Sequence, residues 1–191
     1  MNQHKDHLQA IQEIKSMMER STKFSSISGM AGIVVGVLAI IVFGGITWFD
    51  VTAIYPLFVI MVGTLVIAIS IGLKLSIQKA KKEGAPIFDT TAKRFLVHFF
   101  TPLIVGGILC LIFAYHSDYT YIPSIMLIFY GFALLHASKF SLDTIKNLGY
   151  LELIIGLFAA AFTTYGMWCW AIGFGLLHVI YGFIIYTKYE K

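Results

Sequence analysis

Four ionisable side chains interrupt long apolar stretches of this sequence and are the residues best suited to chemistry: His98, His136, Glu152 and His178. An ionisable group inside a membrane is energetically expensive, so its presence there indicates a function. Three imidazoles and a carboxylate could bind zinc, iron or copper, two histidines could ligate a haem, and a His/Glu set could relay protons. We treat the four residues as one candidate intramembrane polar site.

Structural roles are also open to these residues. The sequence contains no local ligand motif such as HxxxH or HExxH, so no catalytic, metal-binding or cofactor-binding residue is assigned, and no cofactor. His98 and Glu152 could instead face water and headgroups at the inner interface, and His136 and His178 could bond a backbone carbonyl or a Ser/Thr side chain of a neighbouring helix. Glu152 is expected about one turn from the inner end of its helix, where it could pair with Lys146 or Lys93.

Two of the histidines end the same short phrase. Residues 131–136 read Gly-Phe-Ala-Leu-Leu-His, and residues 173–178 read Gly-Phe-Gly-Leu-Leu-His. An internal duplication would explain this, since many transporters are built from repeats around a central site. Similar composition in two closely packed helices is the alternative. A diverged third unit would place Ala68 where the other two have histidine.

The elements that must position these side chains are transmembrane helices. The 191 residues are 58% hydrophobic and 13% charged, whereas soluble domains average about 45–50% apolar and about 25% charged residues. Backbone amides in lipid must be bonded within the segment, which favours helices. We predict an all-α, polytopic protein with six helices, at residues 27–48, 55–76, 95–115, 122–142, 148–165 and 168–187.

The distribution of basic residues predicts the orientation. All 14 Lys and Arg fall on one side of the membrane if both termini are cytoplasmic, as the positive-inside rule requires. The helices then form three hairpins, at residues 27–76, 95–142 and 148–187, which turn at the outer face and have antiparallel neighbouring helices. Residues 25–191 form this transmembrane domain, and residues 78–94 form its longest inner loop.

Residues 1–24 have apolar side chains at helical spacing and are predicted to form a cytoplasmic amphipathic helix. This helix could lie on membrane lipid, bind a protein partner or cover the inner face of the protein itself. The small residues Ser28, Gly32 and Gly36 allow close helix packing, either within the chain or in a homo-oligomer. Cys110 and Cys169 could pair or act as small apolar residues. The basic residues flank membrane helices, so nucleic acid is not an expected partner.

The segment Met17-Met18-Glu19-Arg20-Ser21, which leads into the first spanning helix, resembles a family of uncharacterised bacterial six-helix membrane proteins. The resemblance implies a bacterial cytoplasmic (inner) membrane and brings no activity, cofactor or binding residue with it. From the residues themselves we expect a non-enzymatic regulatory or interaction protein. The alternatives are a small transporter or channel that uses the membrane-embedded His and Glu residues, and a haem- or metal-binding redox protein.

Overall fold

The computed structural model describes residues 27–51, 53–82 and 90–191, and in these ranges the chain is helical and has no strand. The predicted amphipathic helix at residues 1–24 lies outside the described residues. The helices are α2 (Gly29–Trp48), α3 (Ile54–Lys82), α4 (Thr90–Tyr115), α5 (Ile122–Ser138), α6 (Asp143–Ala161), the 3₁₀ turn η1 (Thr163–Tyr165), α7 (Gly166–Trp170), the π-helical segment η2 (Ala171–Leu177) and α8 (His178–Tyr189).

The lengths and apolar composition of these elements make the chain a multi-pass helical membrane protein. Five helical stretches are long and apolar enough to cross a membrane, and the last of them joins η1, α7, η2 and α8 into one rod, Thr163–Tyr189. The helix α5 is shorter, at 17 residues. Each of the six predicted apolar runs is thus confirmed as a helix, although their ends differ from the prediction.

Several of the predicted helix ends were wrong. Both ends of the loop predicted at residues 78–94 are helical, because α3 continues to Lys82 and α4 begins at Thr90. The helix α6 begins at Asp143 rather than residue 148, with an acidic residue in the first turn, where the helix dipole favours it. The chain then reverses at Phe162 (φ −126°, ψ 71°), and Gly166, which lies between the helices predicted at residues 148–165 and 168–187, is part of α7. Hydropathy misses this turn because Phe162 is as apolar as the helices on either side.

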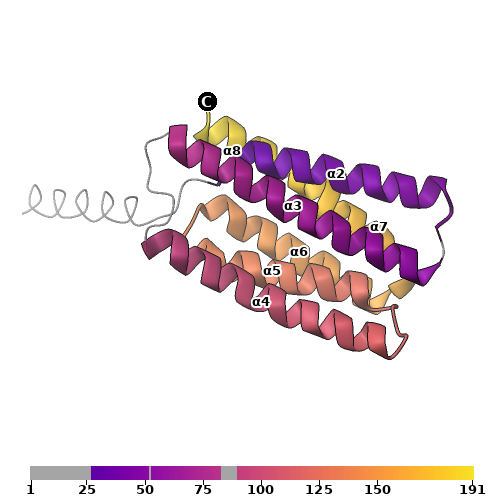
Figure 1. Ribbon diagram of the computed structural model, residues 1–191. Coiled ribbons are helices and arrows are strands. Elements are labelled where there is room, and N and C mark those ends of the chain that lie inside the picture. The colour runs from indigo at the N-terminus through magenta and orange to yellow at the C-terminus, as the bar shows by residue number, and fades with distance from the viewer. Residues whose placement is uncertain (1–26, 52, 83–89) are drawn as a thin grey trace, which may run out of the picture.

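Much of the packing joins helices that are distant from each other in the sequence. The helix α5 lies between α4 and α6, whereas α2 packs against α8 and η2. The helix α3 makes its main contacts with α2 alone. In Figure 1 the turns after α2 and after α4 lie at one end of the bundle, and the C-terminus lies at the other. The last rod does contact α6, its predicted hairpin partner, but α6 packs more extensively on α5.

Glycines permit the closest of these approaches. A Cβ atom added at Gly32 would lie 3.0 Å from the Cα of Gly182, and one at Gly36 would lie 2.7 Å from the Gly175 carbonyl oxygen. Side chains at these positions would force α2 away from the last rod. The small residues singled out in the sequence therefore pack inside the chain, against α8 and η2.

Polar contacts connect α2 and α3 to a residue near the C-terminus. The backbone N–H of Gly29 donates to Glu190 Oε1 at 2.6 Å, and Lys79 Nζ lies 3.4 Å from the same oxygen. Lys79 Nζ also donates to the carbonyl of Ile27 at 3.0 Å. Since Lys79 is only 9% exposed, these contacts satisfy a charge that would otherwise be poorly solvated.

The glycine packing predicts a difference between two substitutions in α2. Gly36→Leu should lower the stability of the protein, by about 1–3 kcal/mol, since overpacking a close contact costs about that much. Gly44→Leu should be nearly neutral, because no atom lies within 4 Å of a Cβ atom at Gly44. Thermal unfolding of both purified variants in detergent, followed by circular dichroism, tests this. Equal shifts in the unfolding temperature would contradict the packing.

Candidate functional site

A tyrosine, a histidine and a glutamate from three helices form a polar network inside the bundle. Tyr130 comes from α5, Glu152 from α6, and His178 is the first residue of α8. The Tyr130 hydroxyl lies 2.7 Å from His178 Nε2, and His178 Nδ1 lies 2.9 Å from the Gly173 carbonyl oxygen and 3.6 Å from Glu152 Oε1. The exposed fraction is 6% for His178 and 0% for Glu152, so the network lies well away from solvent.

The position of the Gly173 carbonyl determines which atoms of the network donate. A carbonyl oxygen only accepts hydrogen bonds, so His178 Nδ1 must carry a proton and donate it to Gly173. The Nε2 atom of a neutral imidazole is then an acceptor, and the Tyr130 O–H donates to it. A charged pair of His178 and Glu152 would bring nitrogen and oxygen to about 2.7–2.9 Å, and the observed separation is 3.6 Å.

Glu152 is the least satisfied member of the network. Neither of its carboxyl oxygens has a hydrogen-bond partner among the described residues. The side chain lies against Gly173, where an added Cβ atom would fall 2.6 Å from Oε2. Its predicted position, one turn from the inner end and paired with Lys146 or Lys93, was wrong. The helix α6 begins earlier than predicted, which places Glu152 near its middle.

The structure does not bring the four predicted site residues together. His98 is exposed, bonds the Arg94 carbonyl through Nδ1 at 2.8 Å and lies against the ring of Phe140. His136 is exposed in the last turn of α5. Only Glu152 and His178 lie near each other, and within the described residues no three His, Cys, Asp or Glu side chains could hold a metal ion. Cys110 and Cys169 are separate, buried free thiols.

Tyr130 is the member of the network that sequence reasoning missed. It directly precedes the first copy of the repeated phrase, within the apolar run of α5. Tyrosines of membrane helices are enriched at the two interfaces, so a tyrosine in the interior of a run is itself unusual. Its position could have indicated a buried hydrogen-bond partner.

A change in helix type explains why the two repeated phrases differ in structure. In an α-helix, five residues turn through about 500°, which puts His136 about 140° around the helix from Gly131. Gly131 faces α6, so His136 points away from it. The second phrase runs through the π-helical segment η2, where bonds join residues five apart. His178 therefore lies one turn from Gly173 on the same face, against Glu152.

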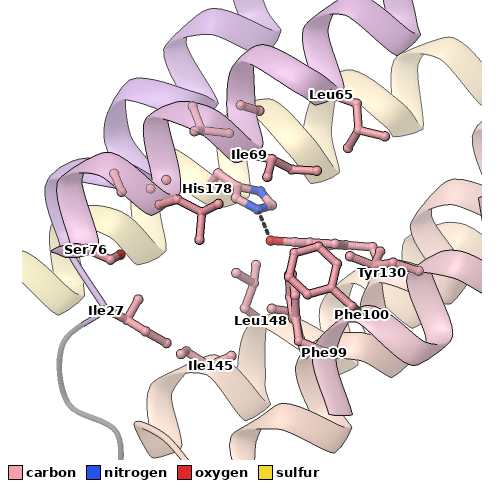
Figure 2. A pocket seen from close by; sticks show the side chains of 18 of the residues that line it. Ile27, Leu65, Ile69, Ser76, Phe99, Phe100, Tyr130, Ile145, Leu148 and His178 are labelled. Carbon is pink, nitrogen blue, oxygen red and sulfur yellow. Dashed lines mark hydrogen bonds between the residues drawn. The ribbon is translucent and has the colours of Figure 1, made fainter. Parts of the chain in front are cut away.

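The network borders a cavity of about 510 Å³. Residues of α3 and α4 form much of its wall, together with residues of α2, α5, α6 and the last rod. Figure 2 shows Tyr130 reaching from α5 toward His178, with Phe99 and Phe100 beside it and Leu65 and Ile69 opposite. Most side chains of the wall are apolar, and the Tyr130–His178 pair places a polar group on this otherwise apolar surface.

This arrangement can bind a molecule and orient it through a hydrogen bond at Tyr130. Its three titratable groups lie close together, but Glu152 is not hydrogen-bonded to His178, so they do not form a continuous path for a proton. Comparison with protein-family models, with curated proteins and with solved structures gives no match to this chain.

Proposed function

We propose that this chain is a non-enzymatic membrane protein that binds an apolar small molecule inside its helix bundle. The cavity beside Tyr130 and His178 carries this proposal. Its volume of about 510 Å³ falls within the range of roughly 300–1,000 Å³ found for small-molecule sites. Such sites combine an apolar wall with a few polar groups that fix the orientation of the ligand, and the Tyr130–His178 pair supplies the polar part.

The arrangement of the helices supports entry from the lipid. The helix α3 has its main contacts with α2, and α4 has its main contacts with α5, while both contribute to the cavity wall. An apolar molecule dissolved in the bilayer would therefore reach the cavity between α3 and α4 without crossing an aqueous phase. The ligand would lose little solvation on this route, because the lipid and the wall are both apolar.

A regulatory role through a protein partner is compatible with this binding function. The segment expected to make such contacts, residues 1–24, lies outside the described residues, so the proposal of a partner rests on its amphipathic sequence. The location in a bacterial cytoplasmic membrane rests on the resemblance of the segment around residues 17–21. The packing of Gly32 and Gly36 inside the chain removes the reason for proposing a homo-oligomer through that stripe.

A second cavity favours transport as the alternative function. It has a volume of about 300 Å³ and is lined by Thr120, Thr163 and Thr164 at the end of the bundle with the inter-helix turns. Met61 borders this cavity and packs with Trp170 in a buried cluster. Met126 and Phe174, which line the larger cavity, pack against this cluster, so the cluster lies between the two cavities. Ligand flux across proteoliposomes, beyond equilibrium binding, would distinguish a transporter from a binding protein.

The proposed orientation has both termini in the cytoplasm and three hairpins that turn at the outer face. It is supported by the sequence, in which none of the 14 Lys and Arg falls in a segment predicted to face outward. Cysteines introduced singly at His116 and Lys82, which are both exposed, should react with an impermeant maleimide from opposite sides of intact cells and inverted vesicles. The native Cys110 and Cys169 are buried and give a low background. Labelling of both positions from the same side would refute this topology.

Filling the cavity should abolish binding. Gly72 lines the cavity and has no atom within 4 Å of an added Cβ atom, so Gly72→Phe should place a ring in the cavity without disturbing the fold. Gly63→Phe on the same helix is the matched control, because Gly63 is equally open but is not part of the wall.

Mass spectrometry of small molecules extracted from the purified proteins provides the measurement. We expect at least a tenfold loss of retained apolar ligand in Gly72→Phe and a native amount in Gly63→Phe. The binding function is contradicted if Gly72→Phe retains the native amount. It is also contradicted if the native protein, purified in mild detergent, retains none.

A further inference from the structure

We infer that the ligand of the cavity is an apolar alcohol whose hydroxyl group donates a hydrogen bond to the phenolic oxygen of Tyr130. This inference rests on the proposed binding function and adds the chemical class of the ligand. It follows from the hydrogen-bonding capacity that remains at Tyr130 and His178 once their contacts with each other and with Gly173 are made.

The imidazole has no capacity left for a ligand. His178 Nδ1 donates to the Gly173 carbonyl at 2.9 Å, and His178 Nε2 lies 2.7 Å from the Tyr130 hydroxyl. Each ring nitrogen forms one in-plane hydrogen bond, so both are occupied. A ligand in the cavity therefore meets this network at the tyrosine.

The tyrosine can offer the ligand only an acceptor. A phenolic group has one proton and two lone pairs, and the proton of Tyr130 is directed to His178 Nε2. Tyr130 is partly buried and forms part of the cavity wall. Its remaining lone pairs thus face a ligand that must supply the proton, as an alcohol does.

The rest of the wall excludes other polar head groups. Lys and Arg are absent from the residues that line the cavity in the described part of the chain, so an anionic head group would be buried without a counter-charge. Ketones, aldehydes, quinones and ethers only accept hydrogen bonds, and their oxygen would face the lone pairs of Tyr130. Figure 2 shows Ser76, another polar residue of the wall, beside Ile27 and away from Tyr130.

The remaining volume suits an uncharged hydrocarbon tail. Leu65 and Ile69 of α3 lie across the cavity from Phe99 and Phe100 of α4. A tail between them would replace lipid contacts with contacts to aliphatic and aromatic side chains, so its affinity would come from packing. The hydroxyl would determine which end of the molecule lies beside Tyr130.

Three probes that share one tail test the inference: farnesol, farnesyl methyl ether and farnesal. Binding of tritiated farnesol to the purified full-length protein in detergent is displaced by each unlabelled compound, with Gly72→Phe protein as the background for partition into micelles. We expect farnesol to bind roughly five- to tenfold more tightly than the ether or the aldehyde, the difference made by one hydrogen bond. Tyr130→Phe alone would free His178 Nε2 as a new acceptor, so the control variant is Tyr130→Phe combined with His178→Leu, which should bind all three probes within about twofold because neither acceptor remains.

The outcomes separate this inference from the proposed function. Equal or tighter binding of the ether or aldehyde to the native protein overturns the alcohol class, and this comparison needs no variant to fold. If the three probes bind equally and Gly72→Phe loses all of them, the cavity is a binding site and only the hydroxyl assignment fails. If Gly72→Phe and Gly63→Phe bind every probe like the native protein, both the binding site and the alcohol class are overturned.

Discussion

The hydrogen bond between His178 Nδ1 and the Gly173 carbonyl is the contact on which the polar centre of this bundle depends. It fixes the proton on one nitrogen and makes the other an acceptor, which in turn directs the Tyr130 hydroxyl. It exists because the π-helical segment brings residues five apart onto one face. Glycine at position 173 also leaves space, since a Cβ atom there would lie 2.6 Å from Glu152 Oε2 and the carboxyl group would have to shift. One residue therefore provides both the acceptor for the histidine and the room for the glutamate.

The same glycine-dependent packing explains where the cavity lies. Close approach of α2 to the last rod at Gly32 and Gly36, and of α5 to α6 at Gly131, draws these helices into tight pairs. The helix α3 has its main contacts with α2 and contributes to the wall opposite α4. The bundle is thus dense along its glycine contacts and hollow between α3 and α4. An apolar site open to lipid is the functional consequence that we propose for this uneven packing.

The sequence predicted the helices well because a backbone in lipid has few alternatives. It also identified His178 and Glu152, since ionisable residues in apolar runs are conspicuous. It failed at the Phe162 turn, where polarity does not change. It also placed the start of α6 too late, and this second error displaced Glu152 toward the helix end. It also failed to distinguish His136 from His178, which follow nearly the same phrase. The difference between them comes from a π-helical segment, which depends on tertiary packing and has no pattern of its own in the sequence.

The state of the His178 ring is the most direct test of the central claim. Nitrogen-15 NMR of histidine-labelled protein in lipid bilayers distinguishes a protonated from an unprotonated ring nitrogen, and a His178→Gln variant assigns the signal. The account predicts a neutral ring with a protonated Nδ1 and an unprotonated Nε2. A ring with a protonated Nε2 and an unprotonated Nδ1, or one with both nitrogens protonated, would contradict it.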